Sequence, residues 1–360
     1  LNFTNNPNNR SYQPRAYADD YTLPEKVYQY TASVQREVGN GMAASVAYVG
    51  SQGRNLFLRS ITNQIVGVQT LGATAGRVVR EFSIVTCADG TTGTGTMCPG
   101  STITGVQNPY GEVDYKTTGG VDSYNALQLA LTRRTSNGVA MNMQYTYAYS
   151  KGTSGGTNEA RTAANAASLP EERPASRVNN GDWDPYEYGY NLFDVRHTFN
   201  LSVLYATRGS GALTGGWSFG GIMNARSGLP LEVQIARNDI VYLDAAGRVF
   251  NSPAADRTAV VNVPGGGASR NVRRPDLIPG VDPFIKDGGL LFLNPAAFAT
   301  PLPGTNGNLE RNSIHGPNFW QVDAVVAKRI GPSRGPSGEL RLEIFNIFNI
   351  TNCANPVGTL

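Results

Sequence analysis

The segment 139–151, VAMNMQYTYAYSK, alternates strictly between two kinds of side chain. Apolar and aromatic residues occupy every odd position from Val139 to Tyr149, and small or polar residues occupy the even positions. Successive side chains of an extended chain point to opposite faces, so this period of two predicts a strand with one apolar and one polar face. Such a strand fits a soluble sheet over a core, or a membrane barrel whose apolar face meets lipid.

The same alternation recurs in seven further segments, and short turns join the eight into four hairpins. The turns are GNG at 39–41, TSNG at 135–138, RGSGALTGG at 208–216 and GPSRGPSG at 331–338. The predicted strands cover residues 27–38, 42–49, 123–134, 139–150, 194–206, 217–226, 319–329 and 339–348. We therefore expect an all-β, antiparallel fold of about eight strands.

Three long connections, residues 51–122, 151–193 and 229–317, separate the hairpins and are rich in Gly, Pro, Asn and Thr. Irregular connections beyond about 15 residues are uncommon in compact soluble domains. Outer-membrane barrels combine short periplasmic turns with long extracellular loops, and strands of roughly 10 residues cross a bilayer when tilted. The pattern predicts a segment of a transmembrane β-barrel, with all three long loops on one side. A secreted β-sandwich that binds a ligand is the alternative from another class.

The alternation also predicts which side chains face lipid. We expect the outward positions to include Leu127, Leu129, Leu131, Met141, Met143, Tyr145, Phe199, Leu201, Val322 and Val326. Aromatic residues near strand ends should form girdles at the two membrane interfaces. These are Tyr28, Tyr48, Tyr147, Tyr149, Tyr205, Trp217 and Trp320.

The composition contains no feature that points to another class. Only 16% of the 360 residues are charged and the net charge is +3, which gives no basis for a nucleic-acid surface. A run of about 18 apolar residues is absent, so a membrane-spanning helix is excluded. The first 20 residues lack a basic stretch followed by an apolar one, so we expect any signal peptide to have been removed or to lie upstream.

Two of the three cysteines, Cys87 and Cys98, flank a glycine- and threonine-rich stretch, CADGTTGTGTMC, that can close as a surface loop. We predict a disulfide between them, which suits an oxidising compartment, and leave Cys353 unpaired.

Catalytic, metal and cofactor sites are not expected. His197 and His315 lack the spaced partners of a metal site or of a nucleophile's base. Asp182, Asp184 and Glu187 could hold Ca²⁺, but the rest of an EF-hand loop is missing, so a solvated loop is favoured. The glycine run at 264–269 has no Lys-Ser/Thr after it and is no phosphate cradle.

A cluster of charged residues near the C-terminal end has two possible roles. Glu339, Arg341 and Glu343 alternate onto the polar face, and Asp323 and Lys328 lie on the neighbouring strand. They could bind a solute, but pairing with one another in a wet interior is the favoured interpretation.

Six blocks of the sequence carry a resemblance to a family. They are YNALQLALTRR (124–134), FDVRHTFNLSVLY (193–205), GGWSFGGIMNARSGLPL (215–231), FLNPAAFATP (292–301), RNSIHGPNFWQVDAVVAKRI (311–330) and LRLEIFNIFNITN (340–352). In this order they resemble the C-terminal part of the barrel of Oar-like TonB-dependent outer-membrane receptors, a group expanded in Acidobacteria. The resemblance covers most of residues 27–357.

The resemblance implies a receptor that imports a nutrient across the outer membrane of a Gram-negative cell and has no enzymatic activity. Residues 1–360 would then be one part of a single barrel domain, without the plug and TonB box. The implied partners are outer-membrane lipid, the plug and remaining strands, the TonB complex and an unknown substrate. An eight-stranded barrel complete in itself, serving as an adhesin or surface anchor, is the other alternative.

Counting strands gives an expectation for the chain ends. If the four short turns are periplasmic, Leu1 and Leu360 both lie on the extracellular side. We therefore expect at least one further strand after Leu360 and an odd number before Leu1. The strands near 27–38 and 339–348 should then not pair with each other.

Overall fold

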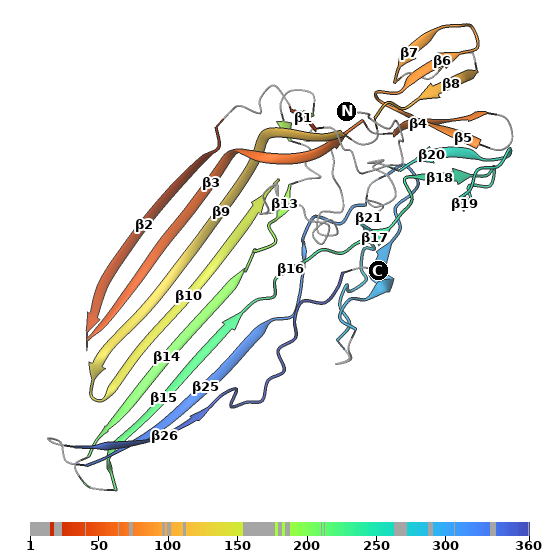
Figure 1. Cartoon of the computed structure of the whole chain (residues 1–360). Helices are drawn as coiled ribbons and strands as arrows, with labels where there is room; N and C mark the ends of the chain where they lie inside the picture. The colour runs from red at the N-terminus through yellow and green to blue at the C-terminus, as the bar shows by residue number, and fades with distance from the viewer. Residues whose placement is uncertain are drawn as a thin grey trace.

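Eight long strands form one antiparallel sheet in the computed structural model (Figure 1). The strands lie side by side in their order along the chain, and each pairs with the next. They are β2 (Lys26–Gly39), β3 (Met42–Thr62), β9 (Val113–Ser136), β10 (Val139–Gly152), β14 (His197–Arg208), β15 (Gly215–Arg226), β25 (Phe319–Ile330) and β26 (Gly338–Ile344). The all-β antiparallel fold expected from the alternation is confirmed.

The structure describes most of the chain, and all statements below concern these residues alone. They are residues 15–17, 24–39, 41–63, 65–71, 75–95, 98, 102–110, 113–153, 177–178, 182–183, 188–209, 211, 213–262, 272–286, 291–305, 307–331, 336–358 and 360. None of the described helices is long and apolar enough to cross a membrane.

The register divides the sheet into two faces of different chemistry. Tyr145 lies opposite Leu129 on one side and opposite Phe199 on the other, and directly opposed residues share a face. Followed across all eight strands, this register places the ten residues expected to face lipid, and the seven girdle aromatics, on one face. We call it the apolar face. The opposite side, which carries Gln144 between Ala130 and Asn200, is the polar face.

The tight turns match the residues found in them. Asn137 and Gly138 have φ values of 55° and 81°, which are the left-handed conformations that the favoured two-residue hairpin turn requires. A Cβ at Gly138 would come 2.3 Å from the carbonyl oxygen of Ala206, so the neighbouring strand also requires a glycine here.

Several predicted boundaries were wrong, and the first long connection is only partly a loop. β3 continues to Thr62 and β9 begins at Val113, because residues 56–62 and 113–120 pair with each other beyond the end of β2. β14 begins at His197 rather than at residue 194. β26 ends at Ile344 rather than at residue 348, since Asn346 adopts a φ of 50° and turns the chain.

The first connection adds two small sheets to the extended β3–β9 pair. One pairs β4 with β5, and the other has the order β7-β6-β8. Their bounds are β4 (Ile65–Leu71), β5 (Ala75–Arg80), β6 (Ile84–Cys87), β7 (Thr92–Thr94) and β8 (Ile103–Gln107). A short strand, β1 (Arg15–Tyr17), runs parallel to β9.

The connection between β15 and β25 is also folded, into four small sheets and one turn of 3₁₀ helix, η3 (Pro295–Ala297). Its strands are β16 (Pro230–Leu231), β17 (Ile235–Ala236), β18 (Ile240–Leu243), β19 (Val249–Phe250), β20 (Thr258–Val261), β21 (Val272–Arg273), β22 (Asp276–Leu277), β23 (Phe298–Ala299) and β24 (Ile314–His315). In the connection between β10 and β14, the described strands are β11 (Arg177–Val178), β12 (Asp182–Trp183) and β13 (Gly189–Tyr190).

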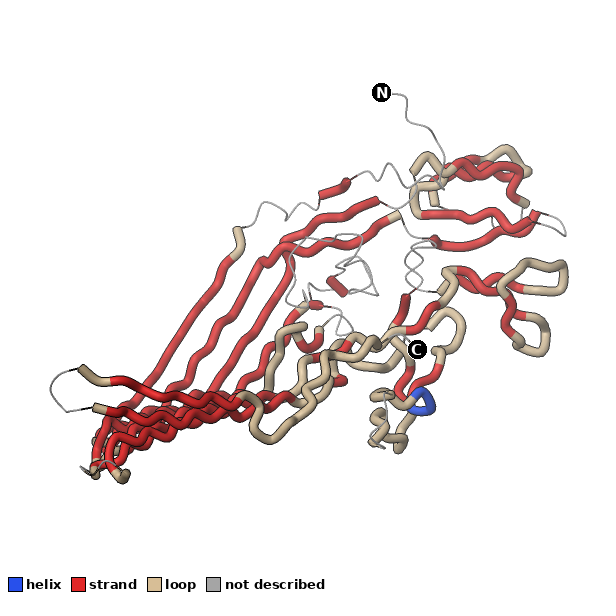
Figure 2. The backbone as a smooth tube through the Cα atoms, turned by 60° about the horizontal axis from the view of Figure 1, so that its bottom comes forward, coloured by secondary structure: helices blue, strands red, loops and turns tan. Residues whose placement is uncertain are grey.

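The folded connections lie at one end of the long strands and the tight turns lie at the other, as two views of the backbone agree (Figures 1 and 2). The C-terminal Leu360 lies at the loop end, where its amide donates to the carbonyl of Gln234 at 2.9 Å. Both observations agree with the expected topology. Leu1 lies outside the described residues.

The sheet is open in the described part of the chain. β2 pairs with β3 and β26 pairs with β25, and β2 and β26 form the two ends of the strand order. The alternative of an eight-stranded barrel closed on itself is therefore wrong for the described strands. The eight strands curve through only part of a barrel, so β2 and β26 lie apart at the two edges of the sheet (Figure 1).

Candidate functional site: the polar face and the folded loops

The polar face provides the surface that a water-filled passage requires. Its central strands carry amides and hydroxyls at successive levels, namely Gln128, Asn142, Gln144, Thr146, Thr198, Asn200, Ser202 and Asn224. The charged group of β25 and β26 adds to it, because Arg341 Nε lies 2.7 Å from Glu343 Oε1. Asp323 accepts from Gln321 and from the amide of Asn346, both at 2.8 Å.

Lys328 does not belong to this charged group, which corrects the sequence interpretation. It lies opposite Trp217 and Leu340, and therefore on the apolar face. Its Nζ lies 4.9 Å from the centre of the Trp217 ring. A lysine near the turn-side end of a strand can extend its charge beyond the apolar region while its stem stays beside the ring.

The loop end of the sheet is held together around Asp194, which is only 1% exposed. Its Oδ1 accepts from the Ser150 amide at 2.7 Å, and its Oδ2 accepts from Arg196 at 3.0 Å. His315 Nε2 lies 3.5 Å from the same Oδ2. Burial alone raises the pKa of Asp194, but the contacts with His315, Ser150 and Arg196 outweigh it and hold the pKa below its usual range.

A second set of contacts joins the end of β10 and the start of β14 to β9 and to the segment before β25. Asn191 Nδ2 donates to Asp122 Oδ1 at 2.5 Å and to Ser150 Oγ at 2.7 Å. The buried Arg311 donates to the carbonyls of Gly152 and Thr153 at 2.7 and 3.1 Å. The end of β10, the start of β14 and the segment before β25 are thus fixed to one another. We call the residues around Asp194, Asn191 and Arg311 the loop junction.

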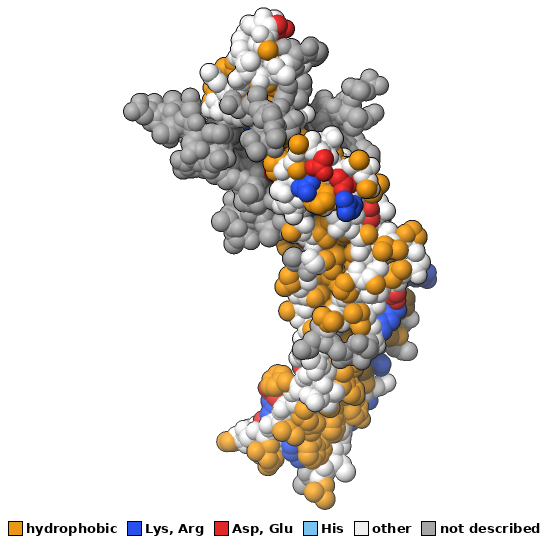
Figure 3. Space-filling model, turned by 90° about the vertical axis from the view of Figure 1, so that its right-hand side faces the viewer, with side chains coloured by type: hydrophobic (Ala, Val, Ile, Leu, Met, Phe, Trp, Pro, Cys, Tyr) orange, Lys and Arg blue, Asp and Glu red, His pale blue; other side chains and the backbone are white. Residues whose placement is uncertain are grey.

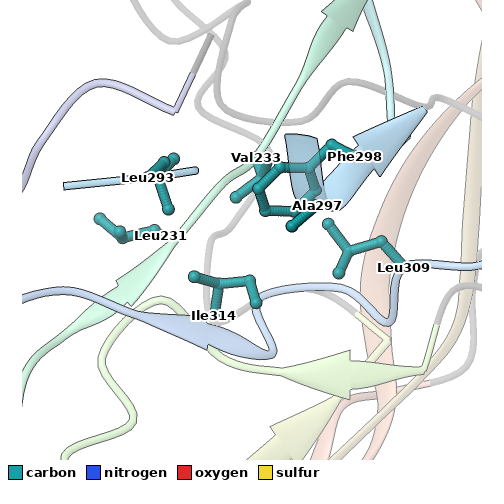
Figure 4. Close-up of a cluster of buried hydrophobic side chains, with 7 residues drawn as sticks. All are labelled: Leu231, Val233, Leu293, Ala297, Phe298, Leu309 and Ile314. Atoms are coloured by element: carbon teal, nitrogen blue, oxygen red, sulfur yellow. The ribbon is translucent and has the colours of Figure 1, made fainter. Parts of the chain in front are cut away.

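The loop region between β15 and β25 has its own apolar core. Side chains from β16, η3, β23, β24 and the segments between them converge in it (Figure 4). Its buried members are Leu231, Val233, Leu293, Ala297, Phe298, Leu309 and Ile314. Burying large apolar side chains contributes roughly 1.5–3 kcal/mol each, so this connection is a folded unit rather than an irregular loop.

Glu232 lies in this unit between two buried residues, Leu231 and Val233. Burial raises the pKa of its carboxyl to about 8, against the opposing charge of Arg311. Gln234 Nε2 donates to Glu232 Oε2 at 3.3 Å, and the Gln234 amide donates to the carbonyl of Gly358 at 2.7 Å. The C-terminal segment is therefore attached beside a carboxyl that is mostly neutral at pH 7.

A pocket of about 490 Å³ opens between the segment 236–241 and the segment 300–303. Its walls are apolar at Val241, Val249 and Leu302 and polar at Asn238 and Asn251. Arg237 also lines the pocket and donates to the carbonyls of Leu302 and Thr305 at 2.5 and 2.8 Å, which holds the two segments together. This mixture of apolar walls and a few amides is the usual lining of a pocket for a small molecule.

Cys87 and Cys98 are disulfide-bonded in the structure, with their Cα atoms 5.7 Å apart. The bond lies beside a small core formed by Val79, Val85 and Ile103. It joins the end of β6 to the segment between β7 and β8. Cys353 is a free, exposed thiol.

The two histidines have structural neighbours. His197 lies on the apolar face, where its Nδ1 is 2.8 Å from the Tyr145 hydroxyl, and His315 contacts Asp194. Within the described residues, no three or more His, Cys, Asp or Glu side chains are grouped to hold a metal ion. Asp184, Glu187 and the glycine run at 264–269 lie outside the described residues, as does the side chain of Asp182, so the weak calcium hypothesis is not tested.

The sequence interpretation missed the loop junction. Asp194 is the first residue of the predicted strand 194–206, and nothing near it in the sequence indicates that its partners lie 44 and 121 residues away. A single carboxylate beside Arg196 and an aromatic residue is the only local signal. This signal is too common to identify a buried centre.

Comparison with known proteins identifies the class. The model of the outer membrane beta barrel domain family matches residues 2–360, and the chain belongs to this family. It is therefore a β-barrel protein of the outer membrane, which confirms the predicted location and contradicts the secreted β-sandwich.

Among solved structures, the outer membrane transporter YddB from Escherichia coli is similar over 94% of this chain, with 10% identity and a TM-score of 0.37. The chain spans 31% of the length of that protein. No curated protein matches the sequence.

Proposed function

We propose that this chain forms part of the barrel wall of a TonB-dependent, Oar-like outer-membrane receptor that imports a nutrient. In this proposal, the polar face lines the lumen, the folded loops receive the substrate outside the cell, and the protein catalyses no reaction. The TonB complex, a plug and further barrel strands are the proposed partners. The resemblance of the six sequence blocks supports this subtype within the family.

The observation that carries the proposal is the combination of an open eight-stranded sheet with large folded loops at one end. An open sheet edge is not stable in lipid, because its unpaired amides and carbonyls have no water to bond. Further strands are therefore needed to close the barrel, and large barrels with a plugged lumen are typical of energised outer-membrane transporters. Loops that have their own core and a pocket favour a protein that recognises a substrate over a protein that forms a passive pore.

The test uses the full-length protein in its native host. We expect the purified protein to bind the C-terminal domain of TonB, and we expect growth on the limiting nutrient to depend on both the receptor and TonB. A variant that lacks residues 236–305 should still fold as a barrel and bind TonB, but should lose uptake. Uptake that is unchanged without TonB would contradict energised transport. Loss of surface attachment alone would instead favour an adhesin.

A further inference from the structure

The apolar face has an uneven distribution of charge. We consider the sheet from the tight turns up to the loop-side ends of β2 and β10. Every described Asp and Glu in this region lies on the polar face, namely Glu37, Asp122, Asp323, Glu339 and Glu343. The apolar face carries cations instead, near the two ends of the strands. They are Lys26, Arg36, Arg54, Arg133, Lys151 and Lys328.

Two of these cations face each other directly. Lys26 on β2 is the register partner of Arg54 on β3, so their Cβ atoms are about 5 Å apart on the same face. Both side chains are exposed. Like charges in directly opposed positions destabilise a strand pair unless an anion lies between them.

The described residues supply no such anion. Arg54 donates to the carbonyl of Gly53 at 2.7 Å and to Gln52 Oε1 at 3.4 Å, which are neutral groups. Neither Lys26 nor Arg54 forms an ion pair with a described carboxylate. By contrast, Lys151 at the same end of the sheet pairs with Glu310 at 2.7 Å. The Lys26–Arg54 pair therefore presents two positive charges that the described chain does not neutralise.

The position of the pair matches the level of lipid headgroups. Tyr28 lies two residues from Lys26 towards the membrane, and Tyr30 and Tyr48 follow, with both hydroxyls donating to Asn125 Oδ1 at 2.9 and 2.8 Å. Tyrosines of this kind mark the membrane interface. From Lys26 to Arg36 is ten residues, which is roughly 25 Å of height for a strand tilted by about 40°, the thickness of an outer-membrane apolar band.

The ring of Tyr30, on the membrane side of the two cations, is held in place by contacts within the strands. A Cβ at Gly50 would come 2.1 Å from the Tyr30 ring, so the ring lies across β3 only because residue 50 is glycine. Gln52 connects this ring to the next strand, because its Nε2 donates to Ser123 Oγ at 2.8 Å. This ring, four residues along β2 from Lys26, is thus held in a fixed position by the strands.

We propose that Lys26 and Arg54 bind the phosphate of an anionic lipid headgroup at the loop-side surface of the outer membrane. The guanidinium donates paired hydrogen bonds to phosphate oxygens, and the ammonium supplies a second charge. The acyl chains would then lie along Val34, Val46 and the other side chains of the apolar face. This inference rests on the membrane placement of the sheet and is independent of the proposed transport function.

The experiment measures lipid binding to the full-length protein in neutral detergent micelles. Fluorescent phosphatidylglycerol is titrated against the wild type and against the Lys26→Gln, Arg54→Gln double variant. We expect the variant to bind about ten- to thirty-fold more weakly. Each basic residue near a membrane surface contributes about 1 kcal/mol of binding free energy, and the variant loses two of them. Phosphatidylcholine should bind weakly to both proteins, and raised salt should reduce the difference.

A matched control removes the same charge elsewhere. Arg329 and Arg341 are strand cations on the polar face, so the Arg329→Gln, Arg341→Gln double variant should bind phosphatidylglycerol as the wild type does. Heat-modifiable migration on a gel checks that each protein is folded. If the first double variant fails to fold, Lys26→Gln alone should weaken binding. Arg54→Lys, which keeps the charge but loses the paired hydrogen bonds, should weaken binding less than Arg54→Gln does.

Three outcomes would overturn the inference. Equal losses in the two double variants would indicate a general effect of net charge. Unchanged binding in the Lys26 and Arg54 variants would remove these residues from any lipid site. Displacement of the lipid by inorganic phosphate at equal concentration would identify a free anion, rather than a headgroup, as the ligand.

Discussion

At the scale of single residues, the direction of a side chain follows from its position in the register. Leu129 lies opposite Tyr145 on the apolar face, and Gln144 lies opposite Ala130 on the polar face. These two neighbours on paired strands therefore face different solvents. The loss of stability caused by a charged substitution at either position should therefore depend on the face that the side chain occupies and little on the strand that carries it.

We expect Leu129→Arg to destabilise the barrel in a bilayer by about 2–4 kcal/mol, because it exposes a charge to lipid near mid-depth. Gln144→Arg is the matched control and should cost little, because its side chain meets water. Folding titrations of the full-length protein into lipid vesicles measure both. Equal costs at the two positions would contradict the assignment of the faces.

The raised pKa of Glu232 predicts a pH dependence of the loop unit. Its carboxyl ionises near 4.5 in the unfolded chain and near 8 when burial protects it. The stability of the unit should therefore fall as pH rises from about 4.5 to 8, by roughly 2–4 kcal/mol, and then level off. Hydrogen exchange at the amides of Gln234 and Leu360, corrected for intrinsic rates, measures this change.

Glu232→Gln is nearly isosteric and cannot ionise, so its exchange profile should be flat over the same range of pH. Residual dependence of the same size in this variant would assign the effect to another group. Asp194 should show the opposite pH dependence, because its pKa is lowered. Its ionised carboxylate stabilises the loop junction above about pH 4, and this stabilisation is lost as pH falls further.

At the scale of elements, the arm formed by β6, β7 and β8 is a small sheet with a four-residue core and a disulfide. A unit of this size buries too little apolar surface to be stable without a covalent or metal link. The Cys87–Cys98 bond is that link. Its removal should therefore affect the arm and leave the barrel strands unchanged.

We expect the Cys87→Ser, Cys98→Ser double variant to lose about 3 kcal/mol of local stability, the chain-entropy value for a loop of this length. Limited proteolysis should then cleave within residues 84–107 while the heat-modifiable barrel remains. Cys353→Ser is the control, since this thiol is free and exposed. Wild-type resistance in the double variant would show that the core alone holds the arm.

At the scale of the whole molecule, the two ends of the sheet differ in size, and hydrophobic side chains cover much of the side of the molecule that Figure 3 shows. The tight turns occupy one end and the folded loops occupy the other. Antiparallel strands reverse direction at each connection, so this asymmetry is a property of the topology. It predicts that labels reach the two ends from different sides of the membrane.

In a Cys353→Ser background, Arg257→Cys in the large loop should react with a membrane-impermeant thiol reagent on intact cells. Asn137→Cys, in the tight turn between β9 and β10, should react only after the outer membrane is permeabilised. Labelling of both positions on intact cells would overturn the predicted orientation.

The sequence alone determined the local features of this protein, because they depend on neighbouring residues. Alternation with a period of two defined eight strands and their faces, and Asn137-Gly138 specified a turn through backbone conformation. The spacing of Cys87 and Cys98 suggested the bond that the structure contains.

Only the tertiary structure decided features that depend on residues far apart in the sequence. The extension of β3 and β9 depends on pairing between residues 56–62 and 113–120, and the loop junction depends on Asp194 meeting Ser150 and His315. Lys328 was grouped with the wrong face, although the alternation of its own strand places it with Trp320 and Val326, and its register with Trp217 confirms the apolar face. A contact or hydrogen bond between residues far apart in the sequence produces no local pattern in the sequence. These features can therefore be seen only in the folded chain.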